Sequence, residues 1–141
     1  MPTWLVKSEP DVYAFDQLVA ERRTFWSGVR NAQARNNLAA MKTGERVLYY
    51  HSNEGREIVG IAEVLAEHYP DPTSPDDPRW VVVDLGPVAR LARPVTLAQC
   101  KDDPILRETA LVRQGRLSVM PVTDAQYARV LELGGGEVPL G

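Results

Sequence analysis

The stretch from Trp26 to Leu38 reads WSGVRNAQARNNL and contains an aromatic residue, a glycine, two arginines and three asparagines. Within it and just after it, Ala34, Leu38 and Met41 recur at the spacing of an α-helix, which predicts a helix with one apolar face. Gly44 is placed to close that helix as its C-terminal cap. We expect this helix to pack on the core, with the rest of the chain arranged around it.

The polar residues of the same stretch suit a binding site better than a core. Asn31 and Arg35 lie one helical turn apart beside the apolar face, so we expect their side chains to point at or near the interior. Buried amide and guanidinium groups need polar partners. Next to an exposed Trp26, such groups indicate a site for a flat, polar ligand.

Length and composition predict one soluble domain over residues 1–141, large enough to bury roughly two-thirds of its surface on folding. Hydrophobic residues make up 44% of the chain and charged residues 25%, as in ordinary globular proteins. No apolar run approaches the ~20 residues of a membrane span. The N-terminus, MPTWLVKSEP, does not resemble a secretory signal, and the single Cys100 fits a reducing compartment. We therefore expect a cytoplasmic protein.

The net charge of −3 and the pI of about 5.4 argue against a protein that coats nucleic acid through many phosphate contacts. The charges are nevertheless uneven. Residues 21–46 contain six basic and two acidic side chains, whereas residues 63–84 contain six acidic side chains and only Arg79 as a base. This pattern fits a basic face for a phosphate-bearing partner, and equally a set of solvated charges without a partner.

The first half of the chain reads as short elements. A strand is expected over Trp4 to Ser8, followed by a short helix capped by Asp16. Val47 to His51 and Ile58 to Ala66 are rich in β-forming residues and are joined by a stretch that suits a hairpin loop. Tyr69 to Pro78 contains four prolines and is expected to be an exposed loop.

The second half continues the mixture. Residues 80–85 and 88–91 predict one long strand that is broken or bulged at Gly86 and Pro87. Thr96 with Gln99 and Thr123 with Gln126 have the spacing of capping boxes, and the second should begin a helix over residues 124–133. A strand is expected over residues 117–119. Five or six strands with three or four short helices favour an α+β fold, a mixed or antiparallel curled sheet that closes toward a small barrel with helices across its ends.

Familiar catalytic and metal sites are absent from the sequence: it has no glycine-rich phosphate loop, no paired-cysteine zinc pattern and no Gly-x-Ser-x-Gly motif. No cofactor or metal is expected. Cys100 is interpreted as a buried structural thiol rather than a nucleophile. Tyr49 and His51 share one face of their strand, and Tyr50 and Ser52 share the other. His51 is either satisfied by a backbone carbonyl or, with Glu9 or Ser52, the base of an enzyme.

Five segments resemble one family closely. They are WLVKSEP (residues 4–10), WSGVRNAQARNNL (26–38), VLYYHS (47–52), IVGIAEV (58–64) and RLSVMPV (116–122). In this order they resemble the EVE domain, including the thymocyte nuclear protein type, over almost the whole chain.

The resemblance implies a PUA-like fold, related to the YTH and ASCH domains, with a pocket that accepts a modified nucleobase flipped out of DNA or RNA. Carried over to the matching positions, the pocket draws on three polar or aromatic segments and the helix-forming stretch. The candidate residues are Lys7, Ser8, Glu9, Trp26, Arg30, Asn31, Arg35, Tyr50, His51, Ser52, Arg116, Leu117 and Ser118.

The leading hypothesis is a binding module without catalysis, whose partner is a nucleic acid carrying a modified base. Trp26, opposed by Tyr50, would stack on the base, while Asn31, Ser8 and Ser52 would pair with its edge. Arginines 30, 35 and 116 would hold the flanking phosphate, and His51 would orient a neighbour. The alternatives are an enzyme that acts on a nucleotide or modified nucleoside through His51, and a protein-interaction module that uses the basic face.

Overall fold

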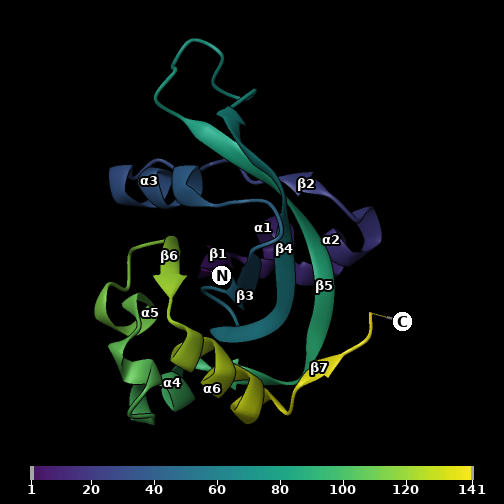
Figure 1. Ribbon diagram of the computed structural model, residues 1–141, viewed down its shortest axis with the longest axis vertical. Helices are drawn as coiled ribbons and strands as arrows, with labels where there is room; N and C mark the ends of the chain where they lie inside the picture. Colours follow the sequence, from purple (N-terminus) through teal and green to yellow (C-terminus); the bar gives the residue numbers. More distant parts are fainter. Residues whose placement is uncertain (1, 141) are drawn as a thin grey trace.

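The computed structural model describes residues 2–140 and contains one curled, mixed sheet (Figure 1). The strand order is β2-β5-β4-β3-β1-β6, and β7 pairs with β5 on the side away from β4. β1 runs parallel to β3, and the other neighbours are antiparallel. The strands are β1 (Thr3–Ser8), β2 (Thr24–Phe25), β3 (Arg46–His51), β4 (Glu57–Pro70), β5 (Val81–Thr96), β6 (Val119–Val122) and β7 (Glu137–Val138).

Short helices occupy the connections between strands. They are α1 (Pro10–Tyr13), α2 (Phe15–Glu21), α3 (Ala32–Ala40), α4 (Leu97–Asp102), α5 (Ala110–Arg113) and α6 (Asp124–Gly134), with the 3-10 helix η1 (Leu106–Glu108). In Figure 1, α3 lies at the upper end of the sheet, while α4, α5 and α6 gather at the lower end. The expected curled sheet with helices across its ends is therefore confirmed.

The long hairpin of β4 and β5 produces the curl. Its register shifts at several points, including one where Ile61 pairs with Ala89 but Ala62 pairs with Pro87. Bulges of this kind bend strands and increase their twist. Gly60 is required at the bend, since a Cβ added there would lie 2.5 Å from the buried ring of Phe15. The hairpin thus wraps around the aromatic part of the core.

The predicted helix after Trp26 is present as α3, and its apolar face is the expected one: Ala34, Leu38 and Met41 are all fully buried. Its ends differ from the prediction. The helix stops at Ala40, and the N–H of Gly44 donates to the carbonyl of Val64, so Gly44 serves a turn rather than the helix end. A tertiary hydrogen bond has replaced the local cap.

Asn31 is the N-cap of α3, and its side-chain oxygen accepts from the N–H of Ala34 at 3.0 Å. The residue is exposed. The expectation that Asn31 points at or near the interior is therefore wrong, because its side chain accepts a hydrogen bond from a backbone N–H in the first turn of the helix. Asp16 is also not a cap, since α2 starts one residue earlier, at Phe15.

The later helices and strands agree closely with those predicted from the sequence. Both capping boxes form, with Thr96 accepting from the N–H of Gln99 and Thr123 from that of Gln126. The last strand of the core starts at Val119, two residues later than expected. Residues 2–140 contain more helical segments than predicted, and the extra ones are single turns. Across these residues, no helix is both long and apolar enough to cross a membrane.

Candidate functional site

Two neighbouring hollows meet at a ridge formed by the end of β1 and the residue that precedes β6. The ridge consists of Lys7, Ser8 and Ser118, which line both hollows. The N–H of Lys7 donates to the carbonyl of Ser118 at 3.0 Å, so the two segments are joined directly. Residues that we expected to form one pocket therefore divide between its two sides.

The first, which we call the aromatic hollow, has a volume of about 370 Å³. It is large enough for a small ligand, whose pockets usually measure about 300 to 1,000 Å³. Beyond the ridge it is lined by Val12, Tyr13, Thr24, Phe25, Trp26, Ser27, Gly28 and Val29.

Trp26 is only 7% exposed, so the expectation of an exposed tryptophan is wrong. Its ring meets Tyr49 edge to face at 5.4 Å between centroids, and Tyr13 at 6.3 Å. Its backbone N–H donates to Val83 at 2.8 Å. Trp26 is therefore fixed by packing on several sides, and the part that remains accessible lines the aromatic hollow.

Tyr49 holds this cluster together from within the core. Its side chain is fully buried, and its hydroxyl donates to the carbonyl of Tyr13 at 2.6 Å. Burial raises the pKa of Tyr49. Tyr13 in turn donates to Glu21 at 2.7 Å, and burial together with that carboxylate raises the pKa of Tyr13 to about 12. Both phenols are neutral donors at physiological pH, which keeps the wall of the hollow rigid.

The second, the cationic hollow, has a volume of about 490 Å³. The Lys7 ammonium donates to the carbonyl of Gly115 at 2.9 Å and lies 5.8 Å from the centre of the Tyr50 ring. Burial lowers the pKa of Lys7. Beyond the ridge the hollow is lined by Glu9, Tyr50, Ser52, Asn53, Arg56, Leu97, Leu111, Gly115 and Arg116.

The predicted division of the two faces of β3 is confirmed. Tyr50 and Ser52 line the cationic hollow, whereas Tyr49 and His51 face the other side with their rings 5.8 Å apart. Because of this arrangement, Tyr50 does not oppose Trp26. Tyr13 is the aromatic side chain that shares the hollow with Trp26.

Arg30 is engaged elsewhere. Its guanidinium pairs with the buried carboxylate of Asp71 at 3.3 Å, donates to Ser74 at 2.6 Å, and lies 5.1 Å from the centre of the Trp80 ring. Arg35 lies 5.8 Å from the same ring. Neither arginine lines the aromatic or the cationic hollow. Arg30 therefore ties the wall of the aromatic hollow at Val29 to the loop between β4 and β5.

Asn31 and Leu117 line a third, shallower hollow of about 310 Å³, together with Arg116. His51 lines none of these three hollows. Its Nε2 accepts from the N–H of Phe15 at 3.1 Å, so its backbone partner is an amide rather than the expected carbonyl. Burial lowers the pKa of His51, which favours the neutral ring that this hydrogen bond requires.

Cys100 is almost completely buried, and burial raises the pKa of its thiol to about 11, as expected of a structural cysteine. Among residues 2–140, no cluster of side chains has the composition of a metal site. Sequence reasoning missed Tyr13, Phe25 and Arg56. Phe25 adjoins Trp26 in the chain, which was a usable signal, whereas Tyr13 and Arg56 reach the hollows only through the folding of β1 and the β3–β4 hairpin.

Three kinds of comparison, with family models, related sequences and solved structures, point to the same family. The EVE domain model matches residues 2–133. Thymocyte nuclear protein 1 of Gallus gallus is 35% identical, over 92% of this chain and 67% of that protein. The structure of protein Atu2648 from Agrobacterium tumefaciens has a TM-score of 0.94 and 44% identity, covering 96% of this chain and 94% of that one.

The human THYN1 protein, solved in complex with DNA containing 5-methylcytosine, has a TM-score of 0.90 and 33% identity. The match covers 98% of this chain and all of that one. The curled sheet is therefore the PUA-like fold that the sequence motifs implied. The family-model match, the related sequences and the shared fold agree, and the chain belongs to the EVE domain family.

Proposed function

We propose that this protein is a binding module, without catalysis, that recognises a modified nucleobase in DNA and holds the flipped-out base in the aromatic hollow. The observation that carries the proposal is the hollow itself, in which Trp26 and Tyr13 present aromatic surface beside the hydroxyls of the ridge. The structure of human THYN1 with DNA containing 5-methylcytosine supports the same class of ligand.

The side chains of the hollow match the chemistry of a base. Stacking on an aromatic ring contributes about 1 to 3 kcal/mol per base and does not depend on base identity. The hydroxyls of Ser8, Ser27 and Ser118 can donate to or accept from the polar edge, which supplies the selectivity. Val12 and Phe25, 67% and 43% exposed, give apolar contacts at the mouth.

Flipping a base costs a few kcal/mol and costs least in a single strand or at a mismatch. Such substrates should therefore bind better than a perfect duplex. The proposal extends to RNA, because stacking and hydrogen bonds to base edges are common to both nucleic acids. A cytoplasmic location is part of the proposal and is supported by the unpaired, buried thiol of Cys100.

The test is a titration of matched oligonucleotides, with cytosine or 5-methylcytosine at one position, single-stranded and duplex, at one stated salt concentration. Ser118→Ala is expected to reduce the preference for the modified base while leaving the fold intact, as checked by circular dichroism. Ile105→Ala, an exposed residue outside both hollows, is the matched control. Equal binding of plain and modified strands, unchanged by Ser118→Ala, would overturn the proposal.

Two further experiments test the alternatives. Turnover of a modified nucleoside that His51→Ala abolishes without loss of fold would indicate an enzyme. A protein partner that stays bound after nuclease treatment and after substitution of Ser118 would indicate an interaction module. The hydrogen bond that His51 accepts from Phe15 gives this histidine a structural task instead.

A further inference from the structure

The cationic hollow shares a wall with the aromatic hollow. Lys7, Ser8 and Ser118 line both, so a single row of side chains separates them. A ligand larger than one base can therefore continue from one hollow into the other without leaving the surface. The next nucleotide of the same strand is such a continuation.

The charges of the cationic hollow favour an anion. Lys7, Arg56 and Arg116 line it, against Glu9 as the one carboxylate in its lining. Within residues 2–140, neither Arg56 nor Arg116 takes part in an ion pair. By contrast, Arg30, which the sequence placed in the same role, is paired with Asp71. The guanidinium groups of Arg56 and Arg116 are therefore available for a phosphate, which accepts two parallel hydrogen bonds from an arginine.

The backbone that carries Arg56 is well fixed. Its carbonyl accepts from the N–H of Leu97 at 2.8 Å, and its φ of +48° belongs to the tight turn of the β3–β4 hairpin. Its Nε makes only a long contact of 3.4 Å with the carbonyl of Asn53. The turn thus presents a free guanidinium from an anchored position, at little cost in backbone ordering on binding.

The remaining surface of the hollow suits a nucleoside. The ring of Tyr50 and the side chains of Leu97 and Leu111 are apolar, and the hydroxyls of Ser52 and the ridge are polar. Resting on the proposed function, we infer that the cationic hollow is a second nucleotide subsite. It binds the phosphate and the nucleoside that flank the flipped base, with Arg56 and Arg116 holding the phosphodiester.

The inference is tested by binding measurements with ligands of increasing length. The probes are 5-methyl-2′-deoxycytidine, its 3′- and 5′-monophosphates, and dinucleotides that carry the modified base at either end. Calorimetry, or NMR chemical shifts where binding is weak, gives each affinity. On the side that enters the cationic hollow, the added phosphate and nucleoside should raise affinity about tenfold to a hundredfold over the free nucleoside. Extension on the other side should add less.

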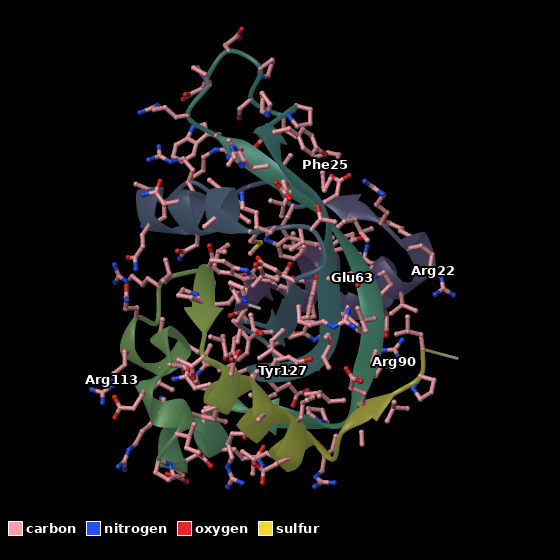
Figure 2. The ribbon with its side chains drawn as sticks, viewed as in Figure 1. Arg22, Phe25, Glu63, Arg90, Arg113 and Tyr127 are labelled. Carbon is pink, nitrogen blue, oxygen red and sulfur yellow. The ribbon has the colours of Figure 1, made fainter. Side chains whose placement is uncertain are left out.

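Two variants locate the effect. Arg56→Gln and Arg116→Gln should each remove most of the gain from the flanking nucleotide and leave the affinity for the free nucleoside unchanged within twofold. Each should also lower the slope of log K against log salt by about 1 for a modified oligonucleotide. The matched control is Arg113→Gln, since Arg113 is the last residue of α5, lies at the outer edge of the molecule (Figure 2) and pairs with Glu108.

The possible failures are distinguishable. If the nucleoside binds but the dinucleotides bind no more tightly, or if the gain survives both arginine variants, the second subsite is wrong while the base pocket stands. If inorganic phosphate alone abolishes the extra affinity of the longer probes, and the neighbouring nucleoside adds no affinity beyond its phosphate, the hollow is a simple anion site. The second nucleotide subsite is then also overturned. If no probe binds at all, the proposed function fails and the subsite with it.

Discussion

The two hollows lie on opposite sides of one ridge but are built in different ways. The aromatic hollow is walled by Trp26, which packs nearly at right angles to the fully buried Tyr49 and is anchored by a backbone hydrogen bond to Val83. The cationic hollow is rimmed by Arg56 and Arg116, which are exposed and lie on turns. Trp26 belongs to the core, whereas the two arginines lie outside it.

This difference separates stability from binding. Substitution of the packed Trp26 removes contacts that also hold the fold, so it should cost both stability and affinity. Substitution of Arg56 or Arg116 should cost affinity alone, because exposed side chains without an ion-pair partner contribute little to folding. Stability and binding measurements on variants from the two sides of the ridge therefore test this difference.

The largest effect is expected for Trp26→Ala. Removing a buried tryptophan from a packed cluster leaves a cavity, and such changes cost about 3 to 5 kcal/mol of unfolding free energy. Urea denaturation monitored by circular dichroism measures the loss. The same variant should also lose the modified-base preference at temperatures where it remains folded.

Arg116→Ala is the counterpart across the ridge, and its unfolding free energy should stay within about 0.5 kcal/mol of the wild type. Both proteins are measured under the same conditions. If Arg116→Ala destabilises the fold as much as Trp26→Ala does, the distinction between a structural and a purely ligand-directed hollow fails.

An intermediate effect is expected for Asp71→Asn, which weakens the tie between the wall at Val29 and the β4–β5 loop. The side chain of Asp71 is fully buried, and that of Arg30 is 42% exposed. Loss of a charged hydrogen bond in this setting should cost about 1 to 2 kcal/mol at pH 7, less than for a fully buried pair because solvent screens Arg30. Denaturation midpoints of the two proteins give the difference.

The difference in unfolding free energy between the wild type and Asp71→Asn should depend on pH. Burial would raise the pKa of Asp71, but hydrogen bonds from Thr73 and Arg30 outweigh it and hold the pKa below its usual value. The stabilisation is therefore fully present above the ordinary aspartate pKa of about 4 and is lost as pH falls through the lower, folded-state pKa. The gap between wild type and Asp71→Asn should narrow below pH ~4. A constant gap down to acid unfolding would show that this charge does not act as described.

Much of the fold was predictable because its signals are local. The apolar spacing of Ala34 and Leu38, the two capping boxes and the hairpin at residues 47–66 each depend on residues a few positions apart, and each is present in the structure. The resemblance of five segments to the EVE domain supplied the fold class that periodicity alone left as a curled mixed sheet.

The site was less predictable because its decisive contacts are distant in sequence. Arg30 meets Asp71 from 41 positions away, and Trp26 is covered by Tyr49, so neither is free in the way its local sequence suggests. The prediction for Asn31 was wrong because of a local contact: its side chain caps the helix by accepting from the N–H of Ala34. The division of one predicted pocket into two hollows depends on two long-range contacts. They are the pairing of β1 with β3 and the hydrogen bond from the N–H of Lys7 to the carbonyl of Ser118, and no sequence motif encodes either.

The smallest effect is expected at the mouth of the aromatic hollow. Phe25, labelled in Figure 2, lies where β2 meets β5 and is 43% exposed. Val12 of α1 is 67% exposed. Because these side chains already face water, Phe25→Ala and Val12→Ala should change the unfolding free energy by no more than about 0.5 kcal/mol. If they contact the sugars and bases beside a flipped nucleotide, each should weaken oligonucleotide binding about two- to fivefold, corresponding to roughly 0.5 to 1 kcal/mol of apolar contact.

The control for this pair is Ile105→Ala, because Ile105 is similarly exposed at 40% but lines neither hollow. It should leave oligonucleotide binding unchanged. The free nucleoside offers a second control, since it does not extend far beyond the hollow and should bind the Phe25 and Val12 variants almost as well as the wild type. A loss of nucleoside binding equal to the loss of oligonucleotide binding would move these two residues from the mouth of the hollow into its base-binding wall.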